Sequence, residues 1–162
     1  VRPMRIFIDT EFQDRPKEGL IELISIGAVK EDGQEFYAES LEFEWASAEP
    51  WVMTNVIANL TGPVMSVHNL FTQFRLFCGD APEFWAYYGA HDWYLVCQLA
   101  GGFQHLPSAW PKHCNELMTL ATVNSAHHAF PVQSGIEHHA LHDARWNLQL
   151  HHYLTTGSYM DD

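Results

Sequence analysis

Three short segments in the first third of the chain carry the apolar patterning of β-strands. Residues 4–10 are nearly all apolar until an acid appears, residues 20–29 are rich in β-branched side chains, and residues 34–40 alternate. Turn-forming residues separate them at 14–19, which we expect to be a turn or mobile loop, and at Glu31-Asp32-Gly33. The pattern predicts an antiparallel meander.

Helical spacing replaces strand spacing after Pro50. One further segment, 83–88, reads as a buried strand. Helices are expected at 51–60, 64–78, 92–99, 115–123 (capped by Asn115) and 141–154. Strands first, then helices alternating with a strand, predict an α/β domain whose mixed sheet is flanked by helices.

Length and composition favour one domain, which we place at residues 4–155 of the 162. Residues 1–3 precede Met4 and are read as added residues or an alternative start, and residues 156–162 are expected to be a frayed tail. No apolar run reaches the roughly 18 residues of a membrane span, and the start has no signal-peptide pattern. The 3 cysteines lack C-x-x-C spacing, so we expect reduced thiols in a cytoplasmic protein.

The charge balance changes the expected kind of partner. The chain has 8 Lys+Arg against 20 Asp+Glu, a formal net charge of −12. A protein that coats nucleic acid through its surface charge should be basic. Either nucleic acid is not the partner, or it is contacted locally through metal ions and a few chosen groups.

Two acids end the first predicted strand, in Ile6-Phe7-Ile8-Asp9-Thr10-Glu11-Phe12. Residues two apart on a strand point to the same face, so Asp9 and Glu11 would present adjacent carboxylates. Such carboxylates repel each other unless a cation lies between them, and a divalent metal ion meets that need. The alternative is a strand that simply runs out into a solvated loop.

Two later segments supply further acids. Asp92 follows the 83–88 strand and opens a helix, where it is either a site residue at the carboxyl end of a strand or only an acid favoured by the helix dipole. Before the last helix, His138 and Asp143 form an H-x-A-x-x-D pattern. Ala140 and Ala144 are small and lie four apart, which would let this helix approach the sheet and bring Asp143 over the strand acids.

These residue types predict metal-assisted phosphodiester cleavage. Four carboxylates, Asp9, Glu11, Asp92 and Asp143, can hold two Mg²⁺ or Mn²⁺ ions roughly 3.5–4 Å apart. One ion would make the attacking water more acidic, and the other would stabilise the leaving 3′ oxygen. His138 would take the proton from that water as general base, and Asp9 is expected to bridge the ions.

The order and spacing of these motifs resemble the DEDDh 3′–5′ exonucleases, and more closely the bacterial exoribonucleases of the RNase AS type. The supporting stretches are 7–12, 21–27, 85–93 and 140–147. The resemblance implies a ribonuclease H-like fold with a mixed five-stranded sheet. It also implies a homodimeric two-metal exoribonuclease that releases nucleoside 5′-monophosphates from single-stranded, adenylate-rich RNA 3′ ends. One departure is His142, where DEDDh enzymes often carry an acid.

Several alternatives stay open. His139 competes with His138 as the base, and His127-His128 and His151-His152 raise the weaker idea of a zinc site. The fold could instead serve a DNA exonuclease, or a nucleic-acid-binding module without catalysis. Candidate substrate contacts are Thr10, Phe12, Trp85, His91, Asn115 and Glu116.

Overall fold

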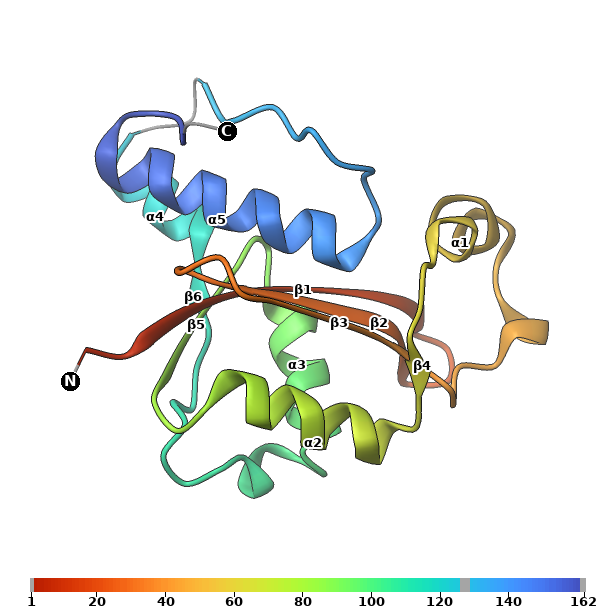
Figure 1. Ribbon diagram of the computed structural model, residues 1–162. Coiled ribbons are helices and arrows are strands. Elements are labelled where there is room, and N and C mark those ends of the chain that lie inside the picture. The colour runs from red at the N-terminus through yellow and green to blue at the C-terminus, as the bar shows by residue number, and fades with distance from the viewer. Residues whose placement is uncertain (1, 126–128, 161–162) are drawn as a thin grey trace.

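The computed structural model describes residues 2–125 and 129–160. It contains a mixed sheet with helices on both faces (Figure 1). The strand order is β4-β3-β2-β1-β5-β6. This arrangement confirms the predicted α/β class and is consistent with a ribonuclease H-like fold. His127 and His128 are not among the described residues.

The meander is confirmed, although the sheet is larger than expected. Strands β1 (Met4–Arg15), β2 (Leu20–Lys30) and β3 (Glu35–Ser40) pair antiparallel, and β5 (Pro82–Ala86) joins β1 in parallel. The expected count of five strands is wrong, because the sheet has six strands within residues 2–125 and 129–160. Its edges are the two-residue strands β4 (Val64–Met65) and β6 (Asn115–Glu116), which are too short to leave a periodic pattern.

The helices divide between the two faces of the sheet (Figure 1). Helices α4 (Leu117–Val123) and α5 (Ala140–Thr156) cover one face, and α2 (Val67–Cys78) and α3 (Ala90–Leu99) cover the other. Helix α1 (Pro50–Asn55) lies beyond the end of the sheet toward which α5 begins. Short 3₁₀ segments span Trp45–Ser47, Ile57–Asn59 and Phe103–His105.

Several element boundaries differ from those expected. The single helix expected over 51–60 is wrong, because α1 ends at Asn55 and a 3₁₀ segment follows at Ile57–Asn59. Strand β1 does not end at the acids: it pairs with β2 as far as Arg15 opposite Leu20, across an irregularity between Glu11 and Phe12. Helix α2 begins only at Val67, because the Ser66 side chain caps its first turn and the two preceding residues join the sheet edge. Helix α4 is capped by Glu116, not by Asn115.

Burial follows this layered arrangement. The larger core lies between the sheet and α2/α3, around Ile6, Ile8, Phe74 and Phe84, all of which are 0% exposed. A second cluster joins α4 and α5. The cysteines Cys78, Cys97 and Cys114 are free thiols. In residues 2–125 and 129–160, no helix combines the length and the apolar character that crossing a bilayer requires.

Helix α5 approaches the sheet at the glycine opposite Asp9. Gly27 pairs with Asp9 across β1 and β2, and a Cβ atom at Gly27 would lie 2.3 Å from the backbone carbonyl of Ala140. Ala140 and Ala144 are fully buried, and the Asn147 amide donates to the carbonyl of Ile8 at 2.9 Å. Any side chain at position 27 would therefore push the start of α5, and Asp143 with it, away from β1.

Candidate active site

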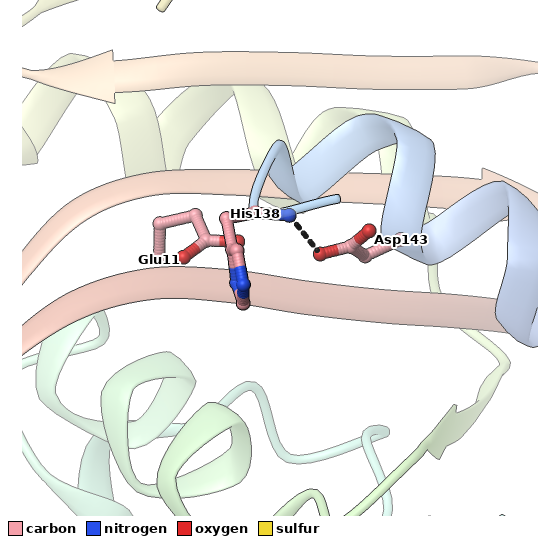
Figure 2. A group of neighbouring side chains, drawn as sticks. All are labelled: Glu11, His138 and Asp143. Carbon is pink, nitrogen blue, oxygen red and sulfur yellow. Dashed lines mark hydrogen bonds between the residues drawn. The ribbon is translucent and has the colours of Figure 1, made fainter. Parts of the chain in front are cut away.

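The structure brings together the four acids and the histidine that the sequence singles out. Asp9 and Glu11 come from β1, Asp92 from the first turn of α3 and Asp143 from the first turn of α5. Ligand atoms of Glu11, His138 and Asp143 lie within 4.8 Å of one another. Figure 2 shows Glu11 on its strand, Asp143 on the helix and His138 on the loop between them.

Asp9 and Asp92 belong to the same cluster through charge and hydrogen bonding. The pKa of Asp9 is raised well above its usual range, first by burial and then by the charges of Asp92, Glu11 and Asp143. Asp92 is 5% exposed, and one of its oxygens accepts from the backbone N–H of Thr10 at 2.8 Å and from the Thr10 hydroxyl. Thr10, which lies between the two β1 acids, thus ties α3 to them.

Asp143 is held at both of its oxygens. The side-chain amide of Gln133 donates to one, and the backbone N–H of His138 donates to the other at 3.1 Å. The second bond, dashed in Figure 2, closes the loop that leads into α5. The carboxylate thereby fixes the backbone of the residue whose ring reaches toward Glu11.

His138 occupies an unusual backbone position at the rim of the cluster. Its φ of +62° is in the left-handed region, where residues other than glycine are uncommon. The Trp51 ring, from α1, and the imidazole pack in a T-shaped arrangement with centroids 5.0 Å apart. His139 instead is 4% exposed and stacks on Tyr37 at 4.6 Å, facing away from the acids. The geometry therefore favours His138 over His139 as the base.

The pKa values of all four carboxylates are raised, and a bound cation would lower them. Burial, with the adjacent Asp143 carboxylate, raises the pKa of Glu11 to about 8. Burial also raises the pKa of Asp92 to about 6, against the lowering effect of the Thr10 hydrogen bonds. The pKa of Asp143 is raised by burial, which the Gln133 and His138 donors oppose. None of the ion pairs among the described residues includes these four acids.

The donor set fits a hard divalent cation. Carboxylate oxygens are the ligands that Mg²⁺ and Mn²⁺ prefer, and mutually repelling buried acids need a positive charge. Beside the acids, a cleft of about 420 Å³ is lined by Asp9, Tyr87, Pro131, Gln133, Glu137, His138, Asp143, Trp146 and Asn147. The arrangement can hold metal ions at one wall of a cleft wide enough for part of a nucleotide.

Without metal, the raised pKa of Glu11 makes stability fall as pH rises. The folded state keeps this proton up to about pH 8, whereas the unfolded chain releases it near 4.5. Between pH 6.5 and 8, we expect the free energy of unfolding in EDTA to fall, with a slope from this one group of at most about 1.4 kcal/mol per pH unit. Urea titrations at pH 6.5, 7.25 and 8 measure this.

A control variant identifies the share of this slope that belongs to Glu11, because the raised pKa values of Asp9 and Asp92 act in the same direction. Burial lowers the pKa of His151 to about 4 and also lowers that of His139, so these histidines add an opposite slope that fades as the pH rises above 6.5. Glu11→Gln removes one of these titrating groups and should make the fall in stability shallower. Saturating Mn²⁺ should also flatten it. A metal-free wild type whose stability is constant or rises from pH 6.5 to 8 contradicts the expectation.

The predicted substrate contacts fall into two groups. Phe12 and His91 stack on each other at 5.0 Å near the acids, and Thr10 is committed to Asp92. The others have partners inside the protein. The Trp85 indole donates to Glu83 and packs on His151, the Asn115 amide donates to the carbonyl of Phe84, and Glu116 accepts from the backbone of Tyr88, Gly89 and Met118.

Four residues that contact the site or line the cleft are not predicted from the sequence to do so. Trp51 contacts the His138 ring, Gln133 binds Asp143, and Tyr87 and Trp146 line the cleft. Trp51 has 56% of its surface exposed, which no periodic pattern indicates. Gln133 lies in a segment without helix or strand. Only the tertiary arrangement brings them to the acids.

Comparison with known proteins gives the family. The family model described as "3'-5' exoribonuclease Rv2179c-like domain" matches residues 4–155. The chain is similar to 3'-5' exoribonuclease Rv2179c of Mycobacterium tuberculosis (strain ATCC 25618 / H37Rv), with 37% identity over 161 residues and 94% of each chain covered. The same identity and coverage relate it to 3'-5' exoribonuclease MT2234.1 of Mycobacterium tuberculosis (strain CDC 1551 / Oshkosh). The chain therefore belongs to the Rv2179c-like 3′–5′ exoribonuclease domain family, a family of hydrolases.

Proposed function

We propose that this protein is a DEDDh-type exoribonuclease of the RNase AS kind, which uses two Mg²⁺ or Mn²⁺ ions to remove nucleoside 5′-monophosphates from RNA 3′ ends. One observation carries the proposal. Four acids on three separate elements converge around His138, and two of them, Glu11 and Asp92, are less than a tenth exposed. An unfavourable cluster of this kind is characteristic of a functional site.

The carboxylates have the task of holding the ions. Asp9, Glu11, Asp92 and Asp143 supply the oxygens, with Thr10 and Gln133 orienting two of them. When bound, divalent ions acidify the attacking water and stabilise the charge on the leaving 3′ oxygen. Asp9 would hold a cation together with the other three acids, because the charges of all three contribute to its raised pKa.

His138 has the task of receiving a proton. Water attacks the phosphorus of the last phosphodiester, and a ring nitrogen of His138 accepts the proton lost by that water. The bond from phosphorus to the 3′ oxygen of the preceding nucleotide breaks, which leaves a 5′-phosphate on the released nucleoside. Trp51 limits the rotation of the His138 ring by packing against it.

RNA is the proposed substrate, with a preference for adenylate-rich ends. The relatives are named exoribonucleases, and the net charge of −12 disfavours binding through a basic surface. Affinity would then come from the ions and from aromatic contacts near the acids, such as Phe12 and His91. We further propose one catalytic domain over residues 4–155, a homodimer and a cytoplasmic location, as the family resemblance implies.

The test compares matched RNA and DNA oligonucleotides, each labelled at its 5′ end. With Mn²⁺, we expect a ladder shortened one nucleotide at a time and release of 5′-monophosphates, with no product in EDTA. A 2′-OH contact worth one hydrogen bond should make RNA about tenfold faster than DNA. Poly(A) should be degraded faster than poly(C), poly(G) or poly(U).

Each part of the proposal has its own contrary result. Equal rates on RNA and DNA remove the assignment to RNA, and equal rates on the four homopolymers remove the adenylate preference. RNA binding with no cleavage under any divalent metal indicates a binding module. Accumulation of nucleoside 3′-monophosphates would show that the bond from phosphorus to the 5′ oxygen breaks, and not the bond to the 3′ oxygen.

A further inference from the structure

The loop that carries His138 is held by contacts with the first turns of α5. His138 is strained at a φ of +62°, so it needs fixed neighbours to keep its ring over the carboxylates. Its own N–H donates to Asp143, as described. A second anchor lies two residues earlier, where the backbone N–H of Ile136 donates to Nδ1 of His142 at 2.9 Å.

The His142 ring fits closely beneath this loop. A Cβ atom at Gly135 would lie 2.9 Å from the Cβ, Cγ and Nδ1 atoms of His142, so only glycine lets the backbone reach the imidazole at this spacing. Because Nδ1 accepts the Ile136 hydrogen bond, the proton of the neutral ring is on Nε2. A neutral acceptor holds the loop without adding another negative charge beside the acids.

The ring is in turn fixed from below. His142 stacks on His139 with centroids 4.3 Å apart, and His139 stacks on Tyr37 of β3 at 4.6 Å. The Nε2 atom of His139 lies 3.1 Å from the Thr61 hydroxyl. This three-ring stack, Tyr37–His139–His142, runs from the sheet to the loop. It connects β3 to the loop backbone that carries His138.

We propose that His142 is a positioning residue for His138, acting through the Ile136 hydrogen bond and the three-ring stack. The inference rests on the proposed function, in which His138 receives the proton. His142 itself does not touch the reacting atoms. It fixes the position of the loop relative to Glu11 and Asp143. This position is important because a misplacement of about 1 Å can lower a rate about a hundredfold.

Two substitutions at position 142 separate the hydrogen bond from the ring. His142→Phe keeps an aromatic ring for stacking and removes the acceptor. His142→Asn places Oδ1 where Nδ1 was, which restores the acceptor on a smaller side chain. His68→Phe is the matched control, because His68 is exposed on α2, on the other face of the sheet. Gly135→Ala is an independent variant that lifts the loop while leaving His142 in place.

The expected signature is a loss of turnover without a loss of binding. His142→Phe and Gly135→Ala should lower kcat on RNA by about ten- to a hundredfold, with KM and the Mn²⁺ affinity from calorimetry within about twofold of wild type. His142→Asn should regain most of the lost turnover, and His68→Phe should match wild type. A purely structural role would change KM, metal affinity and turnover together.

Amide hydrogen exchange tests the inference apart from activity. The Ile136 amide should exchange about tenfold faster in His142→Phe and at the wild-type rate in His142→Asn. Wild-type turnover in His142→Phe, or unchanged Ile136 exchange, overturns the inference. If the wild-type protein cleaves no RNA while Ile136 exchange follows the expected order, the proposed function fails and the loop anchor stands.

Discussion

Replacing Asp9 by asparagine is expected to lower the rate of 5′-monophosphate release by at least about a thousandfold. The side chain keeps its size but loses a negative charge that would help to hold the ions. Metal ions supply several kcal/mol of transition-state stabilisation in such sites, and each 1.36 kcal/mol is a tenfold change in rate. Single-turnover assays on labelled RNA, at Mn²⁺ concentrations up to the millimolar range, measure the loss.

The same substitution is expected to stabilise the metal-free protein. Asp9 is repelled by Asp92, Glu11 and Asp143, and asparagine removes those repulsions. Urea unfolding in EDTA at pH 8 should show a higher midpoint for Asp9→Asn than for wild type. Added Mn²⁺ should raise the wild-type midpoint and leave that of the variant nearly unchanged.

Asp14→Asn is the matched control for Asp9→Asn. Asp14 is exposed on the same strand, so its substitution should leave both activity and metal response unchanged. Wild-type turnover in Asp9→Asn would exclude Asp9 as a ligand. If metal-free Asp9→Asn is less stable than metal-free wild type, Asp9 makes a net stabilising interaction. That result would contradict the expected repulsion among the acids.

The first strand shows what local pattern can and cannot predict. Its apolar start and its two acids were readable because burial and side-chain alternation are properties of neighbouring residues. The length of the strand was not predictable, since Gln13, Asp14 and Arg15 are polar or charged residues typical of a solvent-exposed loop. Pairing with β2 carries the strand through them, and the Gln13 side chain is 1% exposed because it bonds to Glu49 and Ser47.

The start of α5 was predictable for the same reason. Ala140 and Ala144 indicated close approach to the sheet, and both are buried against it. The glycine that receives them, Gly27, lies more than a hundred residues earlier in the sequence, so no local pattern connects it to α5. The approach is a property of two distant segments.

The residues around Glu116 show the opposite limit. From the sequence, Asn115 and Glu116 are candidate base contacts, and Asn115 is alternatively a helix cap. In the fold, pairing of Ala86 with Glu116 brings this carboxylate beneath the turn before α3, where it accepts from Tyr88 and Gly89. Tyr88 has a φ of +51°, so Glu116 holds a strained turn that precedes Asp92. Its proposed base contact would compete with these bonds.

Removing the His138 ring gives the second large effect that we expect. General-base catalysis contributes about a hundred- to ten-thousandfold, so His138→Ala should lower kcat on RNA within that range. All four carboxylates stay in place, so Mn²⁺ affinity should be close to that of wild type. This distinguishes His138 from Asp9, whose substitution removes both turnover and metal response.

Backbone strain at position 138 is controlled by a second variant. Alanine tolerates a φ of +62° poorly, whereas asparagine is several-fold enriched in this region but is no base at neutral pH. If the lost proton acceptor is the cause, His138→Asn should be as slow as His138→Ala. Imidazole added to His138→Ala should restore part of the turnover by entering the space beside Trp51. Full activity in either purified variant would assign the proton transfer to another group.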